Sequence, residues 1–194
     1  MMLSSIQIEK SPAGQSHIHE SAIAQVAGQA VYIDDIAEIQ GTLYAAPIMS
    51  KVAHGNIVAI HTNKAYALEG VCEVVLANDI PGDAIFAAFA HDEAIFAKNK
   101  VEHIGQVIGL VVAKSVSIAR RAAQLVEVEI EELPAVLEVK QALAQKNFVL
   151  PPVKVTRGNP ELGFEQSAHI LHGELEVGGQ EHFYLEGQIA YALP

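Results

Sequence analysis

The run QEHFYLE, from Gln180 to Glu186, gathers the chain's densest set of groups that could do chemistry. It places an amide, two carboxylates, an imidazole and a phenol side by side, and such groups can move protons or bind a polar ligand. In the next residues, 188–193, polar and apolar side chains alternate, as in a β-strand that continues to the end of the segment. Two interpretations therefore stay open at this point: a reactive site, or the framework of a domain that has been cut short.

The histidines raise the question of a metal site. His17, His19 and Glu20 form the densest cluster among nine histidines. They lack the i, i+4 spacing of a helical zinc motif, and no fourth ligand is near in sequence. They also lie in an N-terminal stretch rich in Ser, Gln and Gly, so we expect a solvated arm and no metal site.

Three further positions are typical of structural roles. Asp34 and Asp35 are adjacent, so on an extended chain they would point to opposite sides, which favours a strand terminator or a helix cap over a carboxylate pair. His54, followed by glycine, is expected to be a turn residue that bonds backbone. Cys72 is the only cysteine; its apolar neighbours predict a core residue, and a single cysteine excludes an internal disulfide or an iron–sulfur cluster held by this chain.

The glycine motif GQVIG at 105–109 does not indicate a nucleotide site. It is neither a dinucleotide fingerprint nor a phosphate-binding loop, which would need Gly-Lys-Ser/Thr at the start of a helix. A close-packed strand is the better interpretation, with glycines where another backbone approaches. No nucleophile elbow is present.

The elements that would position these residues follow from periodicity and from capping residues. Ser115 or Ser117 is expected to cap a helix whose inward stripe is Val116, Ala119, Ala122 or Ala123, and Val126. Gly70 is expected to end a shorter helix in the left-handed region. The predicted strands cover 28–33, 41–50, 56–61, 71–77, 106–113 and 127–132, and the predicted helices cover 64–68, 115–126 and 139–145. Two strand–helix–strand units predict an α/β domain with an α+β mixed sheet.

The composition changes between 147 and 159, where Pro151 and Pro152 must be extended, and this change predicts a linker. Strands at 169–176 and 182–193 are expected to form one hairpin, which is marginal in water without cover. We expect the 194-residue chain to self-associate through 169–193 by its free strand edge.

Charge and hydropathy limit the possible partners. The net charge is −11 and no basic run occurs, so nucleic acid and anionic membranes are poor partners. No apolar run approaches the roughly 20 residues of a membrane span, and no signal peptide is recognisable at the N-terminus. These features favour a cytoplasmic protein.

Several segments in order resemble one family. The last of them, Gln180 to Glu186, is the most specific. The others are Gly28–Asp35, Ser50 with Ala53-His54 and Ile57, Asp79–Gly82, Asp92–Ala97, Gly105–Ala113, Glu131–Ala135 and Gly163-Phe164. In this order and spacing they are similar to the start of the molybdopterin-binding (large) subunit in the xanthine dehydrogenase and aldehyde oxidase family.

The resemblance implies a domain organisation. Residues 1–15 would be a flexible arm and 16–146 an a/b hammerhead domain. Residues 147–160 would be a linker, and 161–194 the β-rich start of a truncated molybdopterin-binding domain. In this framework the run from Gln180 to Glu186 is a framework strand and not the catalytic centre.

The resemblance also implies a function for the parent protein. That protein would be a molybdenum hydroxylase that oxidises hypoxanthine or xanthine with water-derived oxygen at a molybdenum–molybdopterin centre. The family's catalytic and cofactor-binding residues lie downstream, so none is expected in this segment, which would scaffold and be inactive alone. Iron–sulfur clusters and FAD would sit on a partner small subunit. An aldehyde oxidase-type relative and a non-catalytic binding or assembly module are the alternatives.

One loop is implied to border the substrate channel. The segment 82–91, between Gly82 and His91, corresponds to a family loop at the substrate funnel. Phe89, with Phe86 and Ala90, is therefore expected to line the substrate channel, whereas plain burial of the loop is the alternative.

Overall fold

A computed structural model describes residues 13–86 and 91–193. The chain divides into two compact units. One comprises the residues up to Glu38 together with those from Glu174 onward, and the other comprises Ile39–Gly173.

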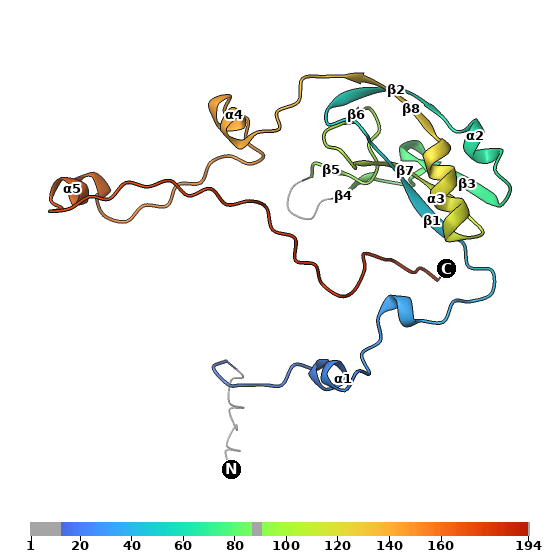
Figure 1. Cartoon of the computed structure of the whole chain (residues 1–194), viewed down its shortest axis with the longest axis horizontal. Helices are drawn as coiled ribbons and strands as arrows, with labels where there is room; N and C mark the ends of the chain where they lie inside the picture. The colour runs from blue at the N-terminus through green and yellow to red at the C-terminus, as the bar shows by residue number, and fades with distance from the viewer. Residues whose placement is uncertain (1–12, 87–90, 194) are drawn as a thin grey trace, which may run out of the picture. The chain divides into compact units, whose positions relative to one another are not determined.

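The unit 39–173 is built on antiparallel sheets (Figure 1). The first has the order β1-β7-β3, from Tyr44–Met49, Val107–Ala113 and Val71–Leu76. The second has the order β6-β2-β8, from Lys100–Val101, Gly55–His61 and Glu127–Glu132. A small hairpin pairs β4 (Ile85–Phe86) with β5 (Glu93–Ala94). The mixed helix-and-sheet fold class expected from the sequence is confirmed.

Strand β7 is the centre of the first sheet because no charged residue interrupts Val107–Ala113 and both of its faces can be buried. Ile108, Val111 and Ala113 are fully buried. Strand β1 lies at the sheet edge and contains Pro47, whose missing N–H is best tolerated there. The β1–β7 ladder also shifts register between Ile48 and Met49.

Helix α3 (Val116–Leu125) packs against β1 and β7. Its N-terminus is capped by the Ser115 side chain, which accepts from the backbone N–H of Ile118 at 3.3 Å. Ala119 and Ala122 are fully buried, as the predicted stripe requires. Val116, the first residue of α3, was expected in the stripe but is 44% exposed.

The remaining elements of this unit are short. Helix α2 (Asn63–Tyr66) packs against α3, and the chain turns at Gly70 with φ 94°, the left-handed conformation expected there. A 3-10 helix η2 (Ala77–Asp79), α4 (Val139–Ala144) and α5 (Pro160–Glu165) complete the helices described. Residues 147–159 contain neither helix nor strand.

The strand–helix–strand order was predicted correctly, but the pairing of the strands needs a correction. The strands around α2, β2 and β3, belong to different sheets, and so do β7 and β8 around α3. Every ladder is antiparallel. Local pattern specifies where a strand forms, whereas its partner is chosen by packing between segments distant in sequence.

The predicted burial of Cys72 is wrong. Its side chain is exposed, whereas Val74 on the same strand is buried. The strand β3 is apolar on both faces, so sequence alone does not reveal which face meets the core. The register with β7 turns Val74 toward the core. Residues two apart on a strand share a face only where the strand is regular. The β3–β7 ladder shifts between Val71 and Glu73, so Cys72 does not share the buried face of Val74.

The other unit has little regular structure. It contains helix α1 (Ala22–Val26) and the 3-10 helix η1 (Ile33–Asp35). The strand predicted at 28–33 is absent, and residues 169–193 contain no strand, so the predicted hairpin is wrong. Alternation alone does not make a strand, because each extended segment needs a hydrogen-bonding partner. Phe183 also has φ 50°, which breaks an extended run.

A glycine test follows from the packing of β7. A Cβ on Gly109 would lie 2.5 Å from the Val75 carbonyl oxygen and 2.7 Å from Leu76 Cδ2. We expect Gly109→Ala to lower the free energy of unfolding by about 1–3 kcal/mol, because backbone cannot move aside cheaply. Urea unfolding followed by circular dichroism measures this change.

The matched control is Gly163→Ala, since a Cβ there meets nothing within 4 Å. The control should unfold at the same or a higher urea concentration than the parent chain. Equal destabilisation by both substitutions would contradict the packing argument.

Candidate functional site

The segment Gln180–Glu186 does not converge on a pocket. Glu181 accepts a hydrogen bond from the backbone N–H of Phe183 at 3.3 Å, and the Gln188 amide donates to the Tyr184 hydroxyl at 3.2 Å. Both contacts are local. Glu186 alone reaches a distant segment, accepting from the backbone N–H of Ile33 at 3.3 Å. Glu181, Tyr184 and Glu186 therefore bind three different partners and do not form one cluster.

The histidine cluster is also engaged locally. His19 Nδ1 lies 2.8 Å from the Ser21 hydroxyl in the turn that precedes α1. Over residues 13–86 and 91–193, no group of three or more His, Cys, Asp or Glu side chains is arranged to hold a metal ion.

Two structural predictions are confirmed. Asp35 Oδ2 accepts from the backbone N–H of Tyr32 at 3.0 Å, so this carboxylate caps η1. His54 Nδ1 lies 2.7 Å from the carbonyl oxygen of Pro134. A carbonyl only accepts, so Nδ1 carries the proton there, and the imidazole ties the start of β2 to the end of β8.

The loop expected to line a substrate channel is only partly described. Phe89 and Ala90 lie outside the described residues. Phe86 ends β4 with 62% of its side chain exposed. His91 Nε2, in the connection between β4 and β5, lies 3.2 Å from Asp83 Oδ2, which precedes β4. The role of Phe86, Phe89 and Ala90 at a substrate channel stays a prediction.

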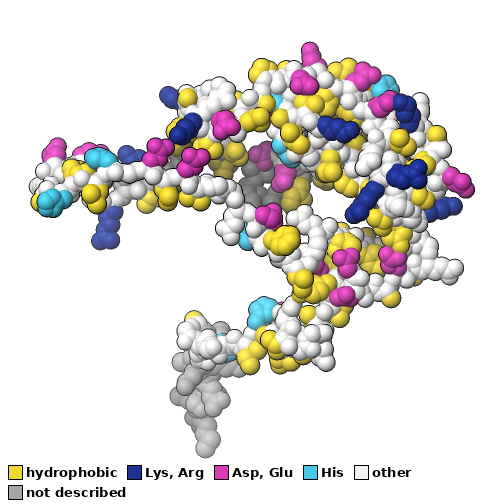
Figure 2. Space-filling model, viewed as in Figure 1, with side chains coloured by type: hydrophobic (Ala, Val, Ile, Leu, Met, Phe, Trp, Pro, Cys, Tyr) yellow, Lys and Arg dark blue, Asp and Glu magenta, His cyan; other side chains and the backbone are white. Residues whose placement is uncertain are grey.

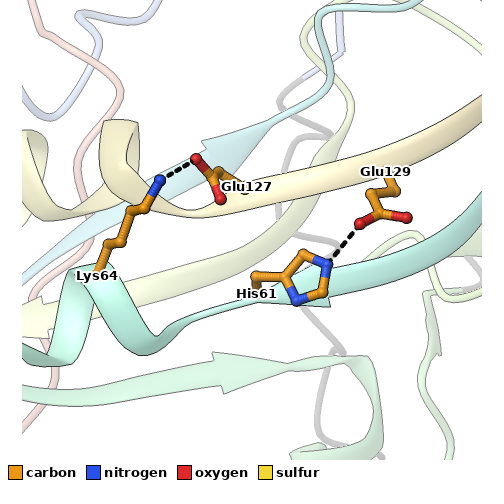
Figure 3. A network of polar contacts seen from close by, with 4 residues as sticks. All are labelled: His61, Lys64, Glu127 and Glu129. Atoms are coloured by element: carbon orange, nitrogen blue, oxygen red, sulfur yellow. Dashed lines mark hydrogen bonds and ion pairs between the residues drawn. The ribbon is translucent and has the colours of Figure 1, made fainter.

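A polar network on the second sheet was not predicted from the sequence (Figure 3). His61 Nε2 contacts Glu129 Oε1 at 2.7 Å, and Lys64 pairs with Glu127. The Lys64 ammonium, hydrogen-bonded to the Glu127 carboxylate, lowers the pKa of that carboxyl. The alternation in 127–132 signalled solvent-facing carboxylates but not their partners. All four side chains are about half exposed, so the network lies on the surface, where it links β2 and α2 to β8.

An open hollow of about 470 Å³ lies beside α2 and β3. Three of its polar side chains are already engaged by neighbouring groups: the Tyr66 hydroxyl donates to Glu73, and it accepts from the backbone N–H of Val74 at 3.2 Å. Asp79 accepts from the backbone N–H of Leu76 at 2.8 Å. The groups that line this hollow are thus committed to the fold.

A second groove of about 410 Å³ lies where both sheets meet the end of α3. Its lining includes Ile48, Ile108 and Val126, which are core residues, and Ile130 of β8. It is the solvent edge of the hydrophobic core. Two of its polar side chains are engaged in the fold, because the Ser50 hydroxyl donates to the Val52 carbonyl at 2.7 Å and Glu127 pairs with Lys64.

The Tyr66–Glu73 contact gives a pH prediction. The hydrogen bond from Tyr66 lowers the pKa of Glu73, and the same bond raises the pKa of Tyr66. A carboxyl whose pKa is depressed in the fold contributes stability above its unfolded pKa, and this contribution is lost as pH falls through the folded pKa. We expect Tyr66→Phe to move the pKa of Glu73 up toward its ordinary value, with the backbone bond from Val74 retaining part of the shift.

Carbon-detected NMR titration of the Glu73 carboxyl in the parent chain and in Tyr66→Phe tests this prediction. Glu127, whose pKa is lowered by its hydrogen bond with Lys64, is the internal control and should keep the same pKa in both proteins. An unchanged pKa of Glu73 would contradict the assigned hydrogen bond.

The described residues contain neither a helix suited to cross a membrane nor an unsatisfied buried polar side chain. No helix within them is both long enough and apolar enough to cross a bilayer. Every buried polar side-chain atom among them already has a hydrogen-bond partner, so none is left for a cofactor to satisfy. Residues 161–193 contain six glutamates and no lysine or arginine, a poor donor set for the anionic phosphate of a pterin cofactor. The residues present therefore do not by themselves fit this group.

Comparison with known proteins matches two regions of the chain to known domain families. Residues 27–134 match "Aldehyde oxidase and xanthine dehydrogenase, a/b hammerhead domain", and residues 140–194 match "Molybdopterin cofactor-binding domain". The xanthine dehydrogenase/oxidase of Gallus gallus is 38% identical over 97% of this chain, and xanthine dehydrogenase 1 of Arabidopsis thaliana is 43% identical over 89%. Aldehyde oxidase 4 of Cavia porcellus is 35% identical over 97%.

The chain spans 13–14% of the length of these curated relatives. Among solved structures, an aldehyde oxidoreductase from Desulfovibrio gigas aligns with a TM-score of 0.58 and 34% identity, covering 63% of this chain and 15% of that one. An aldehyde oxidoreductase from Desulfovibrio desulfuricans aligns with a TM-score of 0.60 and 28% identity, covering 69% and 16%.

The antiparallel sheets, the ordered motifs and the match over residues 27–134 agree. The chain belongs to the aldehyde oxidase and xanthine dehydrogenase family, and it carries that family's a/b hammerhead domain.

Proposed function

We propose that the whole protein is a molybdenum hydroxylase that oxidises hypoxanthine or xanthine with an oxygen atom derived from water. The observation that carries the proposal is the similarity to xanthine dehydrogenases, which extends over 97% of the chain and through both matched regions. When bound, a molybdenum–molybdopterin centre supplies the oxygen-transfer chemistry. This chain's own residues supply a scaffold.

The scaffold role is supported by how the polar groups are used. The carboxylates of Glu73, Asp79 and Glu127 bind neighbouring groups of the fold, and His54 binds a backbone carbonyl. None of these side chains is left to act on a substrate. The hammerhead unit thus contributes packing surfaces, and we infer that the catalytic groups of the whole protein come from outside this chain.

The electron path is part of the proposal. Cys72 is the only cysteine of the chain, and its side chain stands exposed on β3. A [2Fe–2S] cluster needs four protein ligands, mostly thiolates. Any iron–sulfur cluster of the whole protein therefore has its ligands outside this chain, and we propose that the clusters and FAD are carried by a partner small subunit. A cytoplasmic location is part of the same proposal, and a net charge of −11 disfavours nucleic acid and anionic membranes as partners.

A second candidate is oxidation of aldehydes. Aldehyde oxidase 4 of Cavia porcellus is 35% identical to this chain, against 38% for the xanthine dehydrogenase/oxidase of Gallus gallus. The solved structures that align include two aldehyde oxidoreductases. The difference in identity is small, so substrate class must be decided by assay. A non-catalytic assembly module is the alternative from another class.

The test uses the complete gene product with its partner, made in a host that synthesises the molybdenum–pterin cofactor. We expect kcat/KM for hypoxanthine or xanthine to exceed that for benzaldehyde by at least about 10-fold, because a site that hydrogen-bonds a heterocycle rejects a substrate lacking those groups. Growth with tungstate should abolish activity, and ¹⁸O from labelled water should enter the product.

Each other outcome is decisive. Faster turnover of benzaldehyde would replace the purine proposal with the aldehyde one. A molybdenum-loaded protein without activity on either class would favour the non-catalytic module.

A further inference from the structure

Two segments from opposite ends of the chain meet inside one unit. The backbone N–H of Ile33 donates to Glu186 Oε1 at 3.3 Å, across a sequence separation of 153 residues. At the next position, a Cβ built on Gly187 would lie 3.9 Å from Asp34 Oδ2. Residues 186–187 therefore lie against residues 33–34.

Burial distinguishes Glu186 from everything around it. Between residues 143 and 190 every side chain except Glu186 is exposed. Phe183 is 93% exposed and Leu185 is 85% exposed, although both are apolar. The exposed apolar side chains along residues 148–193 are visible in Figure 2. A polar, directed contact, and not apolar burial, holds this stretch of chain in place.

The 3-10 helix η1 has a backbone N–H group, that of Ile33, which needs a hydrogen-bond acceptor from outside the helix. The first N–H groups of a helix have no partner within the helix. Asp35 Oδ2 takes the N–H of Tyr32, which leaves the N–H of Ile33 to be satisfied from elsewhere. Glu186 supplies that acceptor, and an ionised acceptor makes the stronger hydrogen bond. The Tyr32 hydroxyl in turn donates to Gln25 Oε1 at 3.1 Å, which connects the turn to α1.

We propose that residues 30–36 and 184–191 form an intrachain clasp, with Glu186 as its positioning residue. The clasp assigns a role to the two sequence motifs that no pocket uses, the Asp-Asp turn and the QEHFYLE run. It also predicts that the segment before Glu38 folds with the C-terminal segment and not as part of a domain spanning 16–146. The inference does not depend on which substrate the whole protein oxidises.

Amide hydrogen exchange on the full 194-residue chain tests the clasp. In Glu186→Ala the amide of Ile33 should exchange about five-fold faster than in the parent chain, the size expected for one lost hydrogen bond. Glu186→Gln keeps an uncharged acceptor and should give an intermediate rate. Glu176→Ala makes the same charge change nearby and should leave the rate unchanged. An unchanged rate in Glu186→Ala would overturn the clasp.

A cross-link checks the same geometry without removing Glu186. With exposed Cys72 replaced by alanine, the pair Asp34→Cys and Gly187→Cys should form a disulfide several-fold faster than Asp34→Cys with Gly178→Cys. Gly178 lies in the same C-terminal segment, but a Cβ there meets nothing within 4 Å. Equal rates for the two pairs would show that residues 34 and 187 are not held together.

Discussion

The 194-residue chain is expected to contain no stoichiometric molybdenum when it is produced in a host that makes the molybdenum–pterin cofactor. The reason is the set of charged groups in the matched region: residues 161–193 carry six glutamates and no lysine or arginine, and the basic residues before them, Lys140, Lys146, Lys154 and Arg157, are all exposed. An anionic phosphate needs cations or convergent N–H donors, and these carboxylates repel it. Metal analysis by mass spectrometry and pterin fluorescence after oxidation measure the two components independently.

An unrelated molybdenum enzyme made in the same host is the loading control and should reach a ratio near one metal per chain. We also expect no turnover of xanthine or benzaldehyde by the chain alone. Molybdenum near one equivalent in the 194-residue chain would show that Gln180–Glu186 binds the cofactor, and the interpretation of this run as framework would be wrong.

The second large effect is on oligomeric state: we propose that the isolated chain self-associates through residues 148–193. The sequence suggested a free strand edge, but no strand forms there. The driving force is instead a series of apolar side chains in contact with water. The most exposed are Val149 (96%), Leu171 (97%), Phe183 (93%), Val155 (90%), Val153 (89%) and Leu175 (86%).

The net charge of −11 opposes association, but its reach at physiological salt is only about 8 Å. Light scattering after size exclusion should give a dimer or larger species for residues 1–194 and a monomer for residues 1–145. Leu171→Glu with Leu175→Glu should shift the full chain toward monomer. Monomers for both lengths at high protein concentration would contradict the proposal.

Short-range signals predicted the elements that carry strong local information. The uncharged run 107–113 became the central strand, and Ser115 caps α3 as expected. Gly70 adopts the left-handed conformation that follows a helix. The ordered motifs from Gly28 to Glu186 identified the family, which the match over residues 27–134 confirms. These features depend on residues within one turn or one strand of each other, or on their order along the chain.

The errors share one cause, which is contact between distant residues. Cys72 lies on a strand with apolar residues on both faces, and only the irregular ladder with β7 decides that Val74 faces the core. The alternation in 182–193 looks like a strand, yet no partner strand pairs with it, and Phe183 turns out of the extended region. The pairs His61–Glu129 and Lys64–Glu127 form only in the observed register of β2 against β8, and no local sequence pattern specifies that register.

The sequence by itself therefore determined the family, the mixed helix-and-sheet class and the positions of the main strands and helices, because propensity, capping and periodicity act over a few residues. Only the tertiary structure decided that the two strand–helix–strand units place their strands in separate antiparallel sheets. It also decided that Glu186 serves the backbone of Ile33 and not a reactive centre. Strand partners and long-range hydrogen bonds are selected by the joint burial and pairing of segments far apart in the chain, and such selection leaves no signal within any one of those segments.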